Sequence, residues 1–123
     1  LEIGYNGTVR YLRHEEIIYI IVSNHNLTFF LENNDQCHIR KSLNSLEQEL
    51  PDTFCRIHSN CLVNVSKIKE IRKDERIVSF HEGSERNIVE KRINGLIKAY
   101  IGQRESNHIK YSDSYAKYGA VTS

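Results

Sequence analysis

The side chains that can do chemistry gather in one short segment of this 123-residue chain, between Phe54 and Ile68. Five of them are polar groups that can donate hydrogen bonds to phosphate oxygens or to the edges of bases. They are Arg56, His58, Ser59, Asn60 and Lys67. Because apolar residues stand on both sides of these donors, we expect an extended segment that presents the polar groups outward. The ordinary alternatives are a structural hydrogen bond for the histidine and a solvated loop position for the lysine.

The same segment offers soft ligands for a metal ion, because Cys55, His58 and Cys61 recur at every third position. This spacing is not a usual zinc arrangement, and side chains in a strand alternate between its two faces. We therefore expect no metal and no other cofactor. A reversible disulfide among Cys37, Cys55 and Cys61 stays open, although three cysteines without regular spacing do not indicate a disulfide framework.

An enzymatic role would require His58 to activate the hydroxyl of Ser59 as a nucleophile. Adjacent side chains in an extended segment point to opposite faces, so this pair cannot act together. The sequence also contains no nucleophile elbow and no phosphate-binding glycine loop. We therefore expect that the protein is not an enzyme.

The elements around this segment are predicted to be mainly short β-strands. Asn6-Gly7 is a strong hairpin signal, because both positions of the tight turn need a positive φ. The β-branched run from Ile17 to Val22 indicates a strand that is buried on both faces. Residues 23–26 and 33–35 are polar turns, and residues 59–64 fit no single element. The expected strands are 2–5, 8–12, 17–22, 27–31, 37–40, 54–58, 68–71, 77–80 and 86–89.

Two segments have the apolar spacing of helices. Ser42 can cap a helix over residues 43–50, where leucines recur on one side and a proline follows. After Lys91 the apolar residues again recur at helical spacing, and this pattern fades about ten residues further on. We therefore divide the chain into a domain over residues 1–101 and a C-terminal tail over residues 102–123, which we expect to be partly disordered.

The formal net charge of +1 conceals an uneven distribution of charge. Residues 1–62 carry 5 basic and 8 acidic side chains, whereas residues 63–123 carry 12 basic and 8 acidic side chains. The densest basic stretch lies between residues 56 and 76, and the pair Lys91-Arg92 follows it. A solvated charged face is the ordinary explanation. The more specific explanation is that these basic residues form a phosphate-binding edge on an otherwise neutral domain.

Composition narrows the class of protein. Apolar residues make up 39% and charged residues 27% of the chain, which fits one small globular domain. No apolar run approaches the roughly 20 residues of a membrane span, and the cysteine usage suits a reducing cytoplasm. The chain contains no Met, so we expect a piece of a longer protein with a further domain upstream.

The segment Phe54–Ile68, FCRIHSNCLVNVSKI, resembles the LytTR-type DNA-binding domain, whose motif is F-x-R-[IVC]-H-R-S-x-L-V-N-L-x-x-I. Upstream, residues 16–20 and 42–50 are similar to the strand and the short helix that precede this motif in the family. Downstream, residues 77–83 and 88–92 are similar to the final strands of the family and the basic pair that ends them. The resemblance covers all of the chain except the tail.

This resemblance implies a mainly β, elongated fold of about ten short strands with one or two short helices. It implies that loops, rather than a recognition helix, enter successive major grooves of double-stranded DNA. Domains of this family usually form the C-terminal output domain of a bacterial response regulator, after a phosphorylated receiver. A receiver would then have preceded this chain, and homodimers formed through it would bind direct repeats in promoters. A β-rich protein-interaction or ligand-binding module without a nucleic-acid role is the alternative.

The resemblance also implies contacts with DNA in three loops. In the first loop, Asn24 or His25 would contact a base. In the second loop, Ser59 and Asn60 stand where the family has Arg or Asn followed by Ser, so the bidentate guanine contact of an arginine is missing. In the third loop, Arg92 would contact a base. The expected phosphate contacts are Arg56, His58, Lys67, Lys69 and Lys91.

Overall fold

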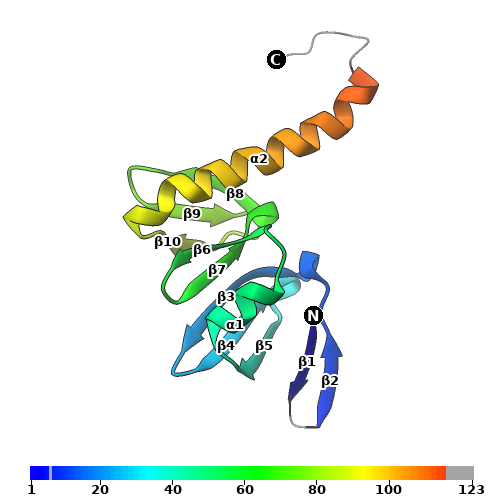
Figure 1. Ribbon diagram of the computed structural model, residues 1–123, viewed down its shortest axis with the longest axis vertical. Coiled ribbons are helices and arrows are strands. Elements are labelled where there is room, and N and C mark those ends of the chain that lie inside the picture. Colours follow the sequence, from blue (N-terminus) through cyan, green and yellow to red (C-terminus); the bar gives the residue numbers. More distant parts are fainter. Residues whose placement is uncertain (6, 116–123) are drawn as a thin grey trace.

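Over the residues that it describes, 1–5 and 7–115, this computed structural model contains ten strands in three antiparallel sheets and two α-helices (Figure 1). The strands are β1 Glu2–Tyr5, β2 Thr8–Tyr11, β3 Ile17–Ser23, β4 Asn26–Leu31, β5 Gln36–Arg40, β6 Phe54–His58, β7 Cys61–Asn64, β8 Ile68–Arg72, β9 Ile77–Phe80 and β10 Glu85–Asn87. The helices are α1 Leu43–Glu49 and α2 Glu90–Tyr115, and short 3-10 helices lie at His14–Glu16, Glu32–Asn34 and Val65–Lys67. The predicted mainly β fold is confirmed.

Five strands form the central sheet, in the order β5-β4-β3-β7-β6. Its middle strand, β3, is buried on both faces as predicted, because Ile17 and Ile20 belong to one core and Ile18 and Tyr19 to the other. A bulge between Ile17 and Tyr19 interrupts the alternation of side chains, so two consecutive residues face the same core. Residues 59–64, which had no predicted element, contribute β7, and β7 pairs with β3.

The first core lies between the central sheet, α1 and the β1–β2 hairpin. Ser42 caps α1 as predicted, with its hydroxyl oxygen accepting a hydrogen bond from the Ser45 N–H at 3.1 Å. The predicted hairpin of β1 and β2 is also present, and Gly7 in its turn has a φ of +75°. Ile3 and Leu12 of this hairpin segment are fully buried in the first core.

The second core lies between the central sheet, the three-stranded sheet β10-β9-β8 and α2. From α2, Ile93 and Leu96 are buried in it. Tyr19 of the central sheet stacks on Phe30 with ring centroids 4.6 Å apart, and its ring lies 5.3 Å from that of Phe80 in β9. The contact between Tyr19 and Phe80 joins the two sheets, and β8 and β9 form a hairpin.

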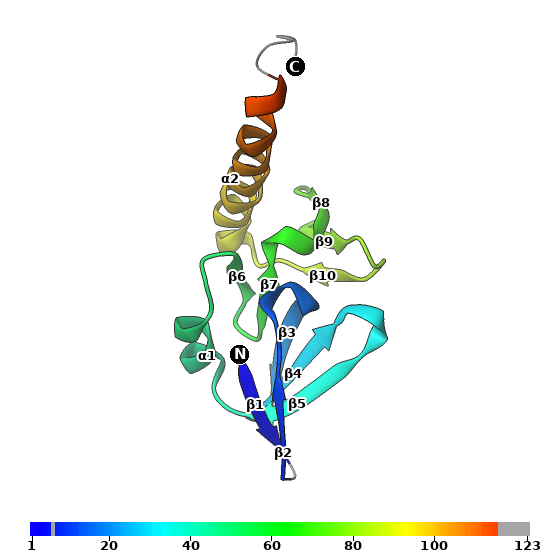
Figure 2. The same cartoon turned by 90° about the vertical axis from the view of Figure 1, so that its right-hand side faces the viewer.

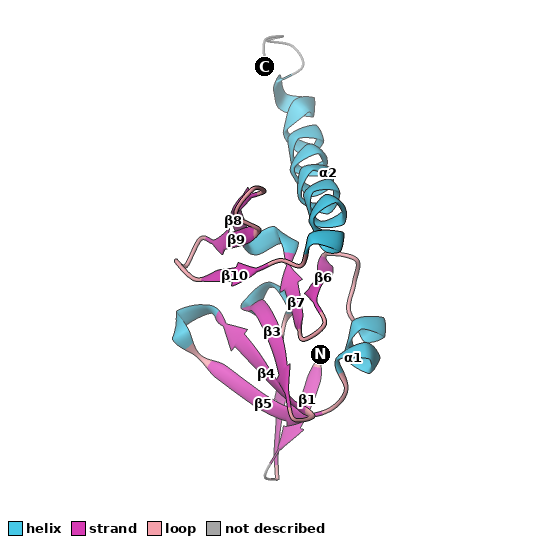
Figure 3. Ribbon diagram, turned by 90° about the vertical axis from the view of Figure 1, so that its left-hand side faces the viewer, coloured by secondary structure: helices cyan, strands magenta, loops and turns pink. Residues whose placement is uncertain are grey.

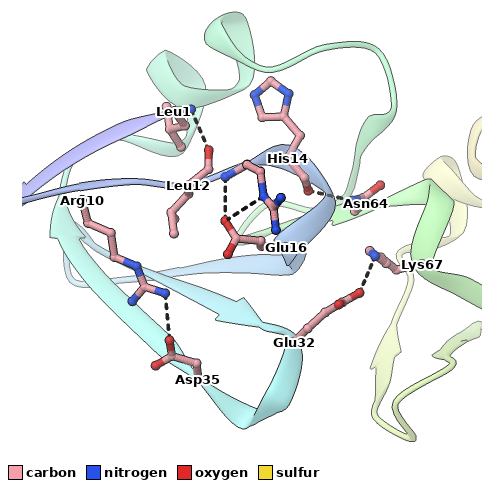
Figure 4. A network of polar contacts seen from close by, with 10 residues as sticks. Leu1, Arg10, Leu12, His14, Glu16, Glu32, Asp35, Asn64 and Lys67 are labelled. Atoms are coloured by element: carbon pink, nitrogen blue, oxygen red, sulfur yellow. Dashed lines mark hydrogen bonds and ion pairs between the residues drawn. The ribbon is translucent and has the colours of Figure 1, made fainter.

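Asn64, at the end of β7, connects elements that are far apart in the sequence (Figure 4). Its side-chain amide donates hydrogen bonds to the carbonyl oxygens of His14 at 3.2 Å and Ile17 at 2.9 Å. Its side-chain oxygen accepts from the Ser66 N–H at 3.1 Å and so caps the short 3-10 helix Val65–Lys67. Since Asn64 is only 2% exposed, these bonds satisfy polar groups that water does not reach.

The second helix is longer than predicted. α2 has 26 residues and continues to Tyr115, past the position where we placed the start of a tail. Its distal part extends away from the three sheets (Figure 2). The boundary between residues 101 and 102 stays a prediction, and residues 116–123 of the predicted tail lie outside the described residues. None of the helices in the described part of the chain is long and apolar enough to cross a membrane.

Candidate nucleic-acid interface

The first predicted loop is the two-residue turn Asn24-His25 between β3 and β4. The φ angles of these residues are 49° and 66°, which are typical of a type I′ turn. Ser23 and Asn26 form the last pair of the β3–β4 ladder, so the turn is tight. Glycine is the usual second residue of such a turn, and a histidine there adopts the left-handed conformation at a higher cost. Both side chains of the turn are exposed to solvent.

The second predicted loop is the turn Ser59-Asn60 between β6 and β7. A β-bulge at Ile57 interrupts the β6–β7 ladder directly before it, and bulges change the direction in which the next side chains point. The Asn60 N–H donates a hydrogen bond to Nδ1 of His58 at 3.3 Å. Because Nδ1 accepts, the hydrogen of a neutral His58 ring is on Nε2. Ser59 is exposed, and His58 and Asn60 are half-buried.

The first two loops are neighbours at one end of the strands of the central sheet. The N–H of Val22 donates a hydrogen bond to the carbonyl oxygen of Asn60 at 2.9 Å. The β3–β7 ladder ends beside this bond, with Ile21 opposite Cys61. Val22 stands only two residues before Asn24, so the tips of the two hairpins lie close together.

The third predicted loop is instead the first turn of α2, which contains Lys91 and Arg92. We keep the name third loop for this turn, and it lies against the bulge of β6. The Val89 N–H donates to the carbonyl oxygen of Ile57 at 2.9 Å, and the Arg92 N–H donates to the carbonyl oxygen of Val89 at 2.9 Å. The bulged residue therefore bonds to the segment that leads into the helix. Lys91 and Arg92 are exposed, and neither forms an ion pair within the part of the chain that the structure describes.

The three loops lie along one side of the molecule. In Figure 1 the tips of the β3–β4 and β6–β7 hairpins and the first turn of α2 are on the left, and Figure 3 faces that side. His58 of the second loop and Glu90 of the third line the same shallow hollow, of about 380 Å³. Glu90 itself pairs with Arg76 at 3.9 Å. The predicted site residues that the structure brings together here are Asn24, His25, His58, Ser59, Asn60, Lys91 and Arg92.

Arg56 lies beneath the second loop and forms its hydrogen bonds within the chain. Its Nε donates to the carbonyl oxygen of His58 at 3.1 Å, and its Nη2 donates to the carbonyl oxygen of Ser59 at 2.6 Å. Its Nη1 donates to Asn44 Oδ1 and to Glu47 Oε1, each at 2.9 Å. The Arg56 side chain is 13% exposed. The expected outward projection of this side chain is therefore wrong, because four acceptors hold it between the loop and α1.

Sequence reasoning missed the two partners of Arg56 on α1. Asn44 and Glu47 stand on the polar side of the predicted helix, a pattern that indicates only exposure to water. Their contact with Arg56 depends on how the chain folds back from α1 into β6. The sequence contained no signal that would have identified this contact.

Lys67 and Lys69 do not lie with the three loops. Lys67 forms an ion pair with Glu32 (Figure 4). Glu32 directly follows β4, whereas the first loop directly precedes it. Because the six residues of β4 span about 20 Å, this ion pair is far from the first loop. The carbonyl oxygen of Lys69 accepts from the Tyr100 hydroxyl at 3.0 Å. Tyr100 stands about 15 Å along the α2 axis from Glu90 at 1.5 Å per residue. These two predicted phosphate contacts are therefore separated from the other site residues.

The three cysteines are free thiols that are buried or half-buried. Burial raises the pKa of Cys61 to about 11 and also raises the pKa of Cys37 and Cys55. Thiols with a raised pKa stay protonated at neutral pH, which makes them weak nucleophiles and weak metal ligands. Within the described residues, no group of three His, Cys, Asp or Glu side chains is arranged to hold a metal ion.

The fold and the site define a class of protein, a small β-rich domain that presents three polar loops and two unpaired basic residues along one side. The family model of the LytTr DNA-binding domain matches residues 7–102. The chain therefore belongs to the LytTR family of DNA-binding domains, and the predicted family resemblance is confirmed.

Among solved structures, the fold is similar to that of the LytTr DNA-binding domain of a methyl-accepting/DNA response regulator from Bacillus cereus. The TM-score is 0.69 and the sequence identity is 19%. The match covers 80% of this chain and 94% of that one. No curated protein matches the chain.

Proposed function

We propose that this domain binds double-stranded DNA in a sequence-specific manner, without catalysis, as the output domain of a bacterial transcriptional regulator that acts in the cytoplasm. The observation that carries the proposal is the alignment of three polar loops along one side of a domain that belongs to a DNA-binding family. Backbone hydrogen bonds connect each loop to the next. We expect a duplex that lies along this side to contact all three loops.

Base recognition is assigned to side chains at the three tips. Arg92 suits the O6 and N7 acceptors of guanine, and Asn60 suits adenine. His25 and Asn24 extend from a rigid two-residue turn, which fixes their direction. Ser59 is short and has only one O–H donor, so it cannot form the bidentate guanine contact of an arginine and contributes less to specificity.

Phosphate binding is assigned to Lys91, with a contribution from the Nε2–H of His58. Lys91 is exposed at the start of α2, where the positive end of the helix dipole also favours an anion. Among the acidic side chains of this edge, Glu90 is paired with Arg76, and this pair reduces its repulsion of phosphate.

The regulatory setting is proposed from the similar solved domain, which is part of a response regulator. A phosphorylated receiver upstream of this domain would control it and would bring two copies together on direct repeats in a promoter. The domain itself supplies the contacts with DNA. We expect a single domain to bind one half-site through its three loops.

Fluorescence anisotropy with a random-sequence duplex at two salt concentrations tests the class of function. We expect binding that weakens as salt rises, because each phosphate contact releases counterions and adds about 0.9 to the slope of log K against log salt. Repeated selection from a random library should then enrich one sequence. Binding that is absent, or independent of salt, would contradict the proposal and favour a protein-interaction or ligand-binding module.

A further inference from the structure

We infer that Arg56 is a positioning residue rather than a phosphate ligand, and that it sets DNA specificity by holding the second loop against α1. This inference rests on the proposed DNA-binding function. Arg56 differs from Lys91 and Arg92 in one respect that matters here, because its side chain is largely buried and four of its five N–H donors form hydrogen bonds within the chain.

The guanidinium group has five N–H donors and no acceptor. In Arg56, four acceptors occupy all three nitrogens, at distances of 2.6 to 3.1 Å. A phosphate oxygen would have to compete with the carboxylate of Glu47 and with two carbonyl oxygens. The geometry therefore leaves Arg56 little capacity to bind the DNA backbone directly.

The four acceptors come from two sides. The carbonyl oxygens of His58 and Ser59 belong to the second loop, whereas Asn44 Oδ1 and Glu47 Oε1 belong to α1. α1 is itself anchored by Leu43 and Leu46 in the first core. Arg56 is thus a rigid connection between a packed helix and the loop that carries Ser59 and Asn60.

This connection acts on the two residues that we assign to base contact. The carbonyl groups that Arg56 holds belong to the peptide units that join His58 to Ser59 and Ser59 to Asn60. A third bond joins the Asn60 carbonyl oxygen to the Val22 N–H. Hydrogen bonds to base edges depend strongly on distance and angle. Non-specific attraction to phosphates depends mainly on charge. Loosening the loop should therefore reduce specific binding and leave non-specific binding nearly unchanged.

The test compares the wild-type 123-residue chain with its Arg56→Lys variant on two probes. One probe is the duplex selected by the wild-type protein from a random library, and the other is a random-sequence duplex of the same length. Lysine keeps the charge but cannot reach four acceptors. We expect the affinity for the selected duplex to fall by roughly tenfold, with the random-duplex affinity and the salt slope unchanged. The amide resonances of Ser59 and Asn60 should shift in the free protein.

A second variant, Glu47→Ala, separates the two roles of Arg56, because a charge effect and a positioning effect would change the affinity in opposite directions. If only charge mattered, Glu47→Ala would remove a negative side chain and strengthen binding to both probes. If Arg56 positions the loop, Glu47→Ala should weaken binding to the selected duplex instead. Glu49→Ala is the matched control, because Glu49 is on the same helix and pairs with Lys41 rather than with the loop.

Three outcomes separate the inference from the function on which it rests. Equal losses on both probes, with a shallower salt slope for Arg56→Lys, would make Arg56 a phosphate ligand and overturn the inference alone. Stronger binding by Glu47→Ala would also overturn it. If the wild-type protein binds neither probe, the proposed function fails. If Arg56→Lys does not fold by circular dichroism, the Glu47→Ala result decides.

Discussion

The N–H of Val22 and the carbonyl oxygen of Asn60 form a 2.9 Å hydrogen bond that joins the first two loops of the candidate interface. It is a bond between backbone groups, so it depends on the pairing of β3 with β7 and not on the side chains of the loops. A second backbone bond, from Val89 to Ile57, joins the second loop to the start of α2. Side chains at the tips can therefore be replaced one at a time without moving the other loops.

Arg92→Ala tests direct reading of a base. We expect the free energy of binding to the selected duplex to weaken by roughly 1–3 kcal/mol, with selectivity lost at one base position. The measurement is a titration of that duplex and of its single-base variants. Lys98→Ala, an exposed position further along α2, should have a smaller and uniform effect. An equal loss on every sequence for Arg92→Ala would contradict a base contact.

Lys91→Ala and Lys67→Ala together test where phosphates bind. Lys91→Ala should weaken binding to all sequences alike and reduce the salt slope by about 1. Lys67 is paired with Glu32 away from the loops, so its replacement should leave the salt slope unchanged and cost at most about 1 kcal/mol of stability. If the two variants lose affinity equally, the phosphate role predicted from the sequence for Lys67 is correct.

His25→Gly separates the role of the side chain from the geometry of the turn. Glycine adopts the positive φ of this position more easily than histidine, so the free energy of unfolding should stay within about 1 kcal/mol of wild type or rise. Binding to the selected duplex should weaken, because the imidazole is gone. Urea unfolding and anisotropy measure the two effects. Unchanged binding would exclude His25 as a base contact.

Asn64→Ala tests the buried connection between β7 and the start of β3. The change leaves the carbonyl oxygens of His14 and Ile17 without their donor, and we expect a loss of about 2–4 kcal/mol of stability. Asn94→Ala, on the exposed side of α2, should change stability by no more than about 0.5 kcal/mol. Urea unfolding compares the two variants, and similar values for both would show that the buried bonds contribute little.

The buried thiol of Cys61 should make the stability of the protein depend on pH in the alkaline range. Burial raises the pKa of its thiol to about 11 from its usual value of about 9, so between these values the unfolded chain has lost the proton that the folded chain keeps. The free energy of unfolding should therefore fall as pH rises from 9 to about 11, by up to about 2–3 kcal/mol from this group. Cys61→Ala should show a smaller decrease over the same range when both are measured by urea unfolding. Identical decreases would contradict the burial effect.

Several features follow from local patterns, and the sequence predicted them correctly. Asn6-Gly7 indicated the first hairpin, Ser42 the start of α1, and the β-branched run from Ile17 a strand buried on both faces. Each of these signals acts within a few residues, because it reflects backbone conformation or burial on one element. The family motif between Phe54 and Ile68 predicted the fold and DNA binding.

Only the tertiary structure decided which of the polar side chains share a site. Arg56 and Lys67 belong to one motif and are predicted alike, yet Arg56 is held by Glu47 of α1 and Lys67 by Glu32 beyond β4. The physical reason is that an ion pair or a ladder bond depends on which segments fold together, and the sequence spacing of a motif does not specify that. The sequence by itself determined the family and most of the elements, but not β7 or the length of α2. The pairing of β3 with β7 and the packing of α1 and α2 determined which residues share the candidate interface.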